Sequence, residues 1–324
     1  MNRREFLAGC AAGAYAIGLG PAAWAQTWPA RPIKIIQGFA PGGNADTIAR
    51  LVGNEIAHGL GQPCVVEAQT GAGGTIGSAA VARANPDGYT LLLATGGHSV
   101  AGAMYNRLPY ETVDSFDMIS TITFFPFLIV VRADSKYGSF SDLLKAAQSA
   151  PGSIAYGTAG IGSTHHLAGE LLSRMAGVSL LHVPYRGDAA STTALLGGEV
   201  PFTIAPPTAV VSSIKAGKLR AIAVTGDSRW SGLPDVPTVA EQGVPGYAVS
   251  SWAGLMAPAG TPRPIIDILN AQIRKAIEVP AVRERLAAMG GEAKASTPEE
   301  MKAMVASELK RWTQVVADAN IPKN

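Results

Sequence analysis

Two glycine-containing turns in this sequence could bind an anion, because each comes between an apolar run and a helical pattern. The first turn spans residues 38–43 (GFAPGG), and a helix is expected to begin after it at Asn44 or Ala45. The first N–H groups of a helix have no partner within the helix, and they carry partial positive charge. Gly42 and Gly43 permit the tight turn and the close approach that anion binding requires.

The first turn lacks the residues of a nucleotide-binding or catalytic loop. No Lys-Ser or Lys-Thr pair follows its glycines to hold phosphates and magnesium, and the turn contains no nucleophile. The chemistry that remains is binding. Asp46 has two interpretations, a contact with the ligand or an acid that stabilises the helix N-terminus.

The second turn, residues 157–163 (GTAGIGS), repeats the order of strand, glycine turn and helix. Hydroxyl groups of Thr158, Ser163 and Thr164 could bind the other end of the same ligand. His165 is a candidate metal ligand or base. Because the chain has no His-Glu-x-x-His spacing, we expect a helix-start histidine with a backbone partner, and we expect no metal or cofactor.

An enzymatic alternative rests on residues 90–101 (TLLLATGGHSVA), which have the context of a hydrolase nucleophile elbow with Ser99 at its turn. Such a hydrolase needs a histidine late in the chain, and the last histidine here is His182. Glycines at 71–77 fit a dinucleotide fingerprint poorly. We therefore expect no enzyme, and Thr95, His98 and Ser99 become candidates for lining a binding cleft.

Short apolar runs alternate with helical patterns along most of the chain, which is typical of an α/β fold with mostly parallel sheets and crossover helices. A capping box at Thr297 and Glu300 predicts the start of a final helix. Strands are expected at 33–39, 64–67, 90–95, 127–131, 153–157, 180–183 and 219–225, and helices at 45–58, 75–84, 99–105, 142–149 and 164–176.

Residues 1–25 have the pattern of an export signal. Arg3 and Arg4 precede an Ala/Gly-rich apolar run too short for an anchor, and residues 23–25 (AWA) match a small-x-small cleavage site. We therefore predict a twin-arginine signal peptide, a mature start at Gln26 and a soluble protein in the periplasm.

Charge and cysteine content exclude several classes of partner and scaffold. The formal net charge of +2 gives no electrostatic basis for binding nucleic acid. Cleavage of the signal would remove Cys10 and leave Cys64 alone, so the core and not a disulfide must hold the fold. Two extended apolar segments, near 127–131 and 249–256, predict two crossings between domains. Domain 1 would then comprise 26–125 plus 250–324, and domain 2 would comprise 126–249, with a ligand cleft between them.

A series of motifs in fixed order resembles the solute-binding proteins of tripartite tricarboxylate transporters, the Bug family. The resemblance covers essentially the whole mature chain. It implies a two-lobed periplasmic binding protein fold of type II, a small carboxylate ligand, no cofactor, and permease subunits in the membrane as partners of a monomeric receptor. The motifs are FAPGG (39–43) with Asp46, GAGGTIG (71–77), PDGYTLL (86–92), LPY (108–110), VPY (183–185), GKLRA (217–221), LPDVPT (233–238) and APAGTP (257–262).

The resemblance and the turns together predict a set of residues that line the cleft. A receptor subunit that senses its ligand for signalling would use the same fold and remains an alternative. The predicted ligand-binding residues are Phe39, Ala40, Gly42, Gly43, Asp46, Thr95, His98, Ser99, Thr158, Ser163, Thr164, His165, Tyr185 and Ala205.

One departure from the family pattern bears on the ligand. Ala205 stands where many relatives of this kind place an aspartate, so an enclosed ammonium group would lack its partner. This predicts a plain aliphatic or aromatic carboxylate, with Phe39, Phe125 and Trp252 as a possible apolar wall. Asp188, which follows Arg186 and Gly187, could replace the lost acid or pair with Arg186.

Overall fold

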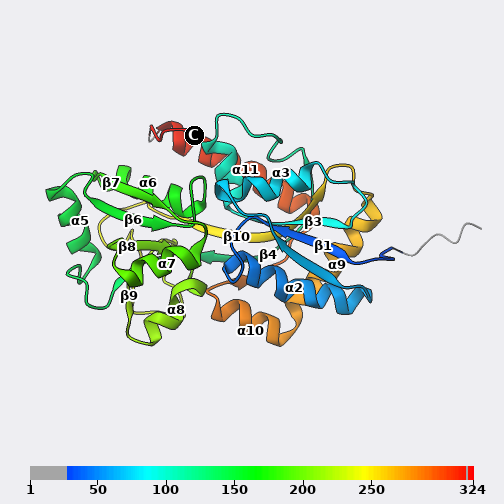
Figure 1. The fold of residues 1–324 in the computed structure, drawn as a ribbon, viewed down its shortest axis with the longest axis horizontal. Helices are drawn as coiled ribbons and strands as arrows, with labels where there is room; N and C mark the ends of the chain where they lie inside the picture. The colour runs from blue at the N-terminus through cyan, green and yellow to red at the C-terminus, as the bar shows by residue number, and fades with distance from the viewer. Residues whose placement is uncertain (1–27, 319) are drawn as a thin grey trace, which may run out of the picture. The chain divides into compact units, whose positions relative to one another are not determined.

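The computed structural model describes residues 28–318 and 320–324, and contacts divide the chain into Met1–Ala30 and Arg31–Asn324. The fold described here is that of the second unit. The predicted export signal, residues 1–25, lies outside the described residues. Two separate sheets with their flanking helices make up the unit (Figure 1), and we call them the first and second lobe in chain order.

The first lobe is built on a six-stranded sheet with the order β11-β4-β10-β3-β1-β2. β1 pairs in parallel with β2 and β3, whereas β10 runs antiparallel to β3 and β4. β1 is an almost continuous buried apolar run, as expected for a strand with both faces covered. The strands are β1 (Ile33–Gln37), β2 (Cys64–Ala68), β3 (Thr90–Thr95), β4 (Phe116–Pro126), β10 (Ser250–Pro258) and β11 (Glu292–Ala293).

The second lobe is built on a five-stranded sheet with the order β7-β6-β8-β5-β9. β6 pairs in parallel with β7 and β8, and β5 runs antiparallel to β8 and β9. The strands are β5 (Leu128–Arg132), β6 (Ile154–Thr158), β7 (Leu180–Pro184), β8 (Phe202–Ala205) and β9 (Leu219–Val224).

Both sheets are mixed, so the prediction of mostly parallel sheets is wrong. The chain leaves the first sheet along β4, enters the second along β5, and returns along β10 after β9. The connecting strands are antiparallel to the strands beside them. β10 pairs in this way with β3 and β4, and β5 pairs in this way with β8 and β9, so both sheets contain antiparallel pairs. The chain changes sheet at Phe127 and again between Val224 and Ser250. The proposed domain division at residues 126 and 250 stays a prediction.

Helices of each lobe connect and cover its strands (Figure 1). Four of them, α7, α8, α9 and α10, have no counterpart among the helices expected from the sequence. The capping box predicted for the last helix is present, since Glu300 N–H donates to Thr297 Oγ1 and Thr297 N–H donates to Glu300. The helices are α2 (Asn44–Leu60), η1 (Ala72–Gly74), α3 (Thr75–Ala82), α4 (Gly97–Met104), α5 (Phe140–Ser149), α6 (Thr164–Met175), α7 (Asp188–Gly197), α8 (Pro207–Lys215), α9 (Arg263–Glu278), α10 (Pro280–Ala288) and α11 (Pro298–Asp318).

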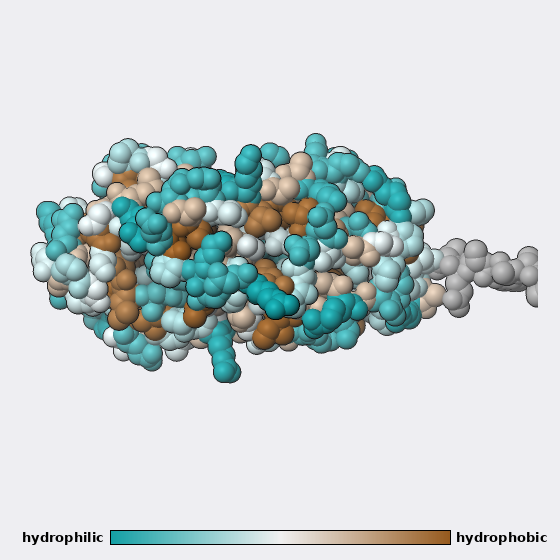
Figure 2. All heavy atoms as spheres, turned by 90° about the horizontal axis from the view of Figure 1, so that it is seen from above, coloured by the Kyte–Doolittle hydropathy of each residue, from teal (hydrophilic) through white to brown (hydrophobic). Residues whose placement is uncertain are grey.

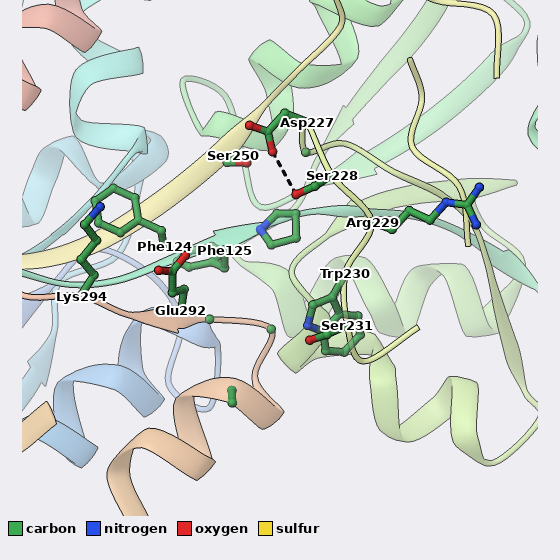
Figure 3. A pocket seen from close by; sticks show the side chains of 15 residues that line it. Phe124, Phe125, Asp227, Ser228, Arg229, Trp230, Ser231, Ser250, Glu292 and Lys294 are labelled. Carbon is green, nitrogen blue, oxygen red and sulfur yellow. Dashed lines mark hydrogen bonds between the residues drawn. The ribbon is translucent and has the colours of Figure 1, made fainter. Parts of the chain in front are cut away.

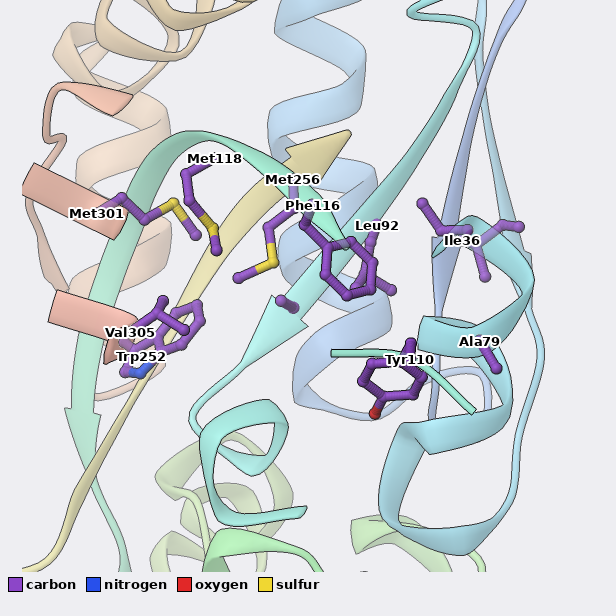
Figure 4. Close-up of a cluster of buried hydrophobic side chains, with 12 residues drawn as sticks. Ile36, Ala79, Leu92, Tyr110, Phe116, Met118, Trp252, Met256, Met301 and Val305 are labelled. Atoms are coloured by element: carbon purple, nitrogen blue, oxygen red, sulfur yellow. The ribbon is translucent and has the colours of Figure 1, made fainter. Parts of the chain in front are cut away.

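A cluster of buried side chains joins the first sheet to α11 (Figure 4). Met301 and Val305 of α11 pack in the same cluster as Trp252 of β10. The indole Nε1 of Trp252 donates to Glu308 at 2.5 Å, and burial raises the pKa of that carboxyl. Trp252, offered as part of an apolar ligand wall, therefore belongs to the core of the first lobe.

Among the described helices, none combines the length and apolar character needed to cross a membrane. On the face drawn in Figure 2, hydrophobic residues form small areas separated by hydrophilic ones. Val65 and Leu181, each about half exposed, lie on the edge strands β2 and β7 of the two sheets.

Candidate functional site

A small cavity of about 20 Å³ lies where the two lobes meet. Its walls come from the ends of strands, from the connecting segments and from the first residues of helices in both lobes. It is lined by Phe39, Asn44, Ala45, Thr95, Phe125, Phe127, Thr164, His165, Asp188, Pro206 and Ser251.

Three helices begin at this cavity. Asn44, Thr164 and Asp188 are the first residues of α2, α6 and α7, and Pro206 directly precedes α8. N–H groups in the first turn of a helix lack intrahelical partners, and each helix N-terminus carries roughly half a positive charge. The convergence of several such ends in one buried space favours an anion.

The turn at residues 38–43 is held by hydrogen bonds to the carboxylate of Asp46. Gly42 N–H donates to Asp46 Oδ2 at 3.0 Å, and Arg50 donates to both carboxylate oxygens at 2.9 and 3.1 Å. Burial alone would raise the pKa of Asp46, but the bonds from Arg50 and Gly42 outweigh it and lower that pKa. Asp46 is therefore a positioning residue, and the N–H of Gly42 is already used within the protein.

The turn at residues 157–163 is held in a similar way by its own hydroxyl groups. Ser163 caps α6, since its Oγ accepts from His166 N–H and donates to the carbonyl of Gly160 at 2.6 Å. Thr158 Oγ1 accepts from Gly160 N–H and lies 2.6 Å from His182 Nε2. Thr158 and Ser163 thus shape the turn, whereas Thr164 and His165 line the cavity.

Two stacked histidines lie behind this second turn. The rings of His166 and His182 are 4.0 Å apart between centroids, and Gly162 N–H donates to His166 Nδ1 at 3.3 Å. Burial lowers the pKa of His166 to about 4. Burial and the neighbouring histidine lower the pKa of His182 to about 3. Both rings are consequently neutral at pH 7, and His166 can accept the hydrogen bond that anchors the turn.

His165 and Asp188 face each other within the cavity. His165 Nε2 lies 3.1 Å from Asp188 Oδ1, and the imidazole packs against Phe127 with 4.2 Å between ring centroids. The backbone partner expected for the His165 ring is not found among the described residues. The residues described also contain no group of three or more His, Cys, Asp or Glu side chains placed to hold a metal ion.

Several predicted site residues lie away from this cavity. His98 contacts Ser78 and the carbonyl of Thr112 beside a separate space of about 10 Å³, and burial lowers the pKa of His98 to about 4. Ser99 is fully buried in α4, although a nucleophile elbow would expose it. The hydrolase alternative therefore lacks an accessible nucleophile at this position.

Two further predicted residues have other roles. Ala205 is 1% exposed and packs in the hydrophobic core of the second lobe, so it is the next residue, Pro206, that reaches the cavity. Tyr185 packs against Gly157 and points its hydroxyl toward Glu199 at 3.4 Å. Ala40 faces Gly187 of the other lobe, whose added Cβ would lie 3.3 Å from it.

Seven cavity residues are absent from the predicted ligand-binding set, although Phe125 and Asp188 were considered separately. Asn44 and Ala45 could have been included, because a helix that binds an anion does so with its first residues and α2 was expected to begin here. Phe127 and Ser251 lie on the two segments that connect the lobes, which must pass the cleft. The seven residues are Asn44, Ala45, Phe125, Phe127, Asp188, Pro206 and Ser251.

Two glycines lie at the boundary between the lobes, and each closely faces residues of the other lobe. A Cβ added to Gly73 of the first lobe would lie 2.4 Å from the carbonyl oxygen of Ile161 in the second. One added to Gly162 would lie 2.6 Å from the ring of Tyr105. Thr208 also donates to Asn44 Oδ1 at 3.1 Å across the same boundary. Side chains at these glycines would hold the lobes apart.

A much larger cavity, of about 670 Å³, opens beside β4 and the segment after β9 (Figure 3). The C-terminal end of α10 borders it, and a helix C-terminus carries partial negative charge. Asp227 and Glu292 add acidic groups, Lys294 adds a cation, and Arg229 is already paired with Glu241 at 3.0 Å. The charges here are mixed and no helix begins among the lining residues, so the smaller cavity at which several helices begin is the better candidate for a carboxylate.

A family model described as the tripartite tricarboxylate transporter family receptor matches residues 48–321 of this chain. The chain belongs to that family. The resemblance seen in the sequence motifs is therefore confirmed, and the family is one of solute-binding receptors and not of enzymes.

Solved structures of similar proteins have the same two-lobed fold. The periplasmic binding protein BugD is 36% identical, with a TM-score of 0.88 over 92% of this chain and 100% of that one. Rpa4515 of R. palustris with adipate is 33% identical, with a TM-score of 0.88 and the same coverage. MatC of Rhodopseudomonas palustris with bound malate is 34% identical, with a TM-score of 0.86 over 89% of this chain and 100% of that one. These likenesses confirm the two-lobed α/β architecture.

Proposed function

We propose that the receptor captures a small carboxylate in the cavity between its lobes and releases it to the membrane permease of a tripartite tricarboxylate transporter. The convergence of the N-termini of α2, α6 and α7 on one buried space is the observation that carries this proposal. The carboxylates bound by the two similar R. palustris proteins, adipate and malate, support it.

The cavity volume implies that capture involves movement of the lobes. About 20 Å³ accommodates roughly one water molecule, whereas a dicarboxylate of four carbons is several times larger. Residues from both lobes surround this space, so entry requires the lobes to separate about the segments that connect them. These observations support the proposal that the lobes close around the ligand after it enters. We also propose that the protein works in the periplasm, where the predicted export signal would deliver it.

The first prediction is that carboxylates raise the melting temperature of the mature protein in differential scanning fluorimetry. A ligand that binds only the folded form stabilises it by about 2.7 kcal/mol at 100 times its Kd. In a chain of this size, that corresponds to a rise of roughly 5 to 10 °C. Neutral diesters of the same dicarboxylates serve as controls. A panel in which no carboxylate shifts the transition would contradict the proposed function.

The second prediction concerns Gly43, where a side chain would project toward the site from an ordinary backbone conformation. Its φ of −77° is ordinary for alanine, and an added Cβ would lie 3.3 Å from the carbonyl oxygen of Ala40 and 3.8 Å from Asp188 Oδ2. We expect Gly43→Ala to weaken carboxylate binding about tenfold, which corresponds to about 1.4 kcal/mol. Isothermal titration calorimetry measures the change.

A matched control for this substitution is Gly197→Ala. Gly197 lies at the end of α7, and a Cβ added there meets no atom within 4 Å. This variant should keep the affinity of the wild type. Equal affinities of Gly43→Ala and the wild type would remove the turn at residues 38–43 from the binding site.

A further inference from the structure

We infer that Asp188 accepts a hydrogen bond from a hydroxyl or ammonium group of the bound carboxylate, so that the receptor selects carboxylates carrying such a donor. This inference rests on the proposed function and names the ligand class more closely. It also reverses the expectation of a plain carboxylate, which was drawn from the absence of an acid at Ala205.

Asp188 is a buried acid whose hydrogen-bonding capacity is not used up by the protein. Its side chain is 9% exposed, and its Oδ1 accepts no hydrogen bond from any described residue. His165 Nε2 lies 3.1 Å away, within ion-pair distance, but this contact is not a hydrogen bond, and neither ring nitrogen of His165 has a hydrogen-bond partner among the described residues. Buried polar atoms in native proteins are almost always hydrogen-bonded, so these atoms point to a partner supplied from outside the chain.

The position of Asp188 places its carboxylate beside the expected ligand. Its Oδ2 faces the turn that begins α2, since a Cβ built on Gly43 would lie 3.8 Å from it. A ligand carboxylate bound at the N-terminus of α2 would therefore lie next to Asp188. Two like charges at this distance repel each other strongly in a buried space. A hydroxyl or ammonium group between them would remove the repulsion and complete the hydrogen bonds of Asp188.

Other acids do not compete for this role. Asp46 is occupied by Arg50 and the N–H of Gly42, and it does not line the cavity. Asp188 is the one acid among the described residues that line this space. Arg186, which could have neutralised it, is solvent-exposed and has no ion pair with Asp188 among those found in the described chain. The acid missing at position 205 is thus supplied from the start of α7.

Titration calorimetry with matched ligand series tests the inference. The first series is succinate, malate and aspartate, and the second is glutarate, 2-hydroxyglutarate and glutamate. In at least one series, we expect the wild type to bind the hydroxy or amino member at least tenfold more tightly than the unsubstituted dicarboxylate. A preference for malate assigns the donor as a hydroxyl group, and a preference for aspartate assigns it as ammonium.

Asp188→Asn is the diagnostic variant, because it keeps the shape of the side chain and removes its charge. We expect it to reduce an amino-acid preference at least tenfold, and Asp188→Ala to abolish the preference for either donor. Asp134→Asn removes an exposed carboxylate of the same lobe and should leave every ratio unchanged.

Three results would overturn the inference. If the unsubstituted dicarboxylate binds as tightly as its hydroxy and amino partners, the donor has no role. Unchanged ligand ratios in both Asp188 variants would show that another group provides the selectivity. Both results leave the proposed function intact, because carboxylates still bind. If neither these ligands nor the wider carboxylate panel bind, the proposed function fails and the inference fails with it.

Discussion

Replacing Gly73 by alanine is expected to weaken carboxylate binding by tenfold or more while the protein still folds. Gly73 meets the second lobe backbone to backbone, and an added Cβ would lie 2.4 Å from Ile161 O and 2.9 Å from the carbonyl carbon of Gly162. Backbone atoms cannot rotate away as the end of a side chain can, so the lobes must stay farther apart. Because cavity residues come from both lobes, incomplete closure separates the helix N-termini that bind the anion.

Gly73→Ala has two effects, since it prevents closure of the lobes and also strains the backbone. The control variant has to show the second effect without the first. Gly73 has a φ of +65°, which costs energy in alanine wherever it occurs. Gly61 has a φ of +66°, and a Cβ added there meets no atom within 4 Å. Gly61→Ala therefore has the same strain without the contact between lobes. It should lose stability but keep its affinity.

Calorimetry and small-angle X-ray scattering together decide the outcome. Wild type and Gly61→Ala should become more compact when a carboxylate is added, whereas Gly73→Ala should change less. If Gly73→Ala binds as tightly as Gly61→Ala, the contact between Gly73 and Ile161 has no part in closure.

Acidification from pH 6.5 to pH 4 is expected to reduce the free energy of unfolding by several kcal/mol. Burial lowers the pKa of His98, His166 and His182 to about 4, 4 and 3 in the folded protein, below the ordinary value of 6.5. The unfolded chain therefore binds more protons in this pH range, and stability falls as the pH falls. Each such histidine contributes up to about 1.4 kcal/mol per pH unit.

Urea unfolding at a series of pH values measures this effect. His182→Gln should make stability less dependent on pH, because one titrating ring is lost and the charge repulsion with His166 disappears. The amide of glutamine can still form a hydrogen bond with Thr158. Stability that stays constant between pH 6.5 and pH 4 would contradict the buried, neutral state of the three rings.

The features that could be predicted from the sequence are those in which a short stretch of residues is compatible with only one local structure. The glycine turns before Asn44 and Thr164 required helix starts, and both helices begin there. The capping box at Thr297 fixed the start of α11 in the same way. Thr95, Thr164 and His165 were placed at the cleft because each follows a strand or turn that had to point toward it, and each lines the cavity.

The features that escaped prediction depend on partners distant in the sequence. Whether Gly42 N–H is free for a ligand depends on the rotamer of Asp46, which hydrogen bonds from Arg50 select. The antiparallel place of β10 between β3 and β4 depends on a chain that returns from the other lobe. Asp188 reaches the cavity because α7 begins there, and α7 has too weak an amphipathic pattern to be predicted from its sequence.

If the ligand binds in this cavity as proposed, closure of the lobes would also govern the timing of its release. A ligand held between closed lobes could not leave until they separate, so its residence time would be limited by the opening rate as well as by its own contacts. Strengthening the contacts at Gly73 and Gly162 would prolong residence without altering any atom that touches the ligand. A partner protein that separates the lobes would therefore speed release of the ligand, even when the ligand is bound tightly. Affinity and speed of delivery can thus be adjusted at different places in the molecule.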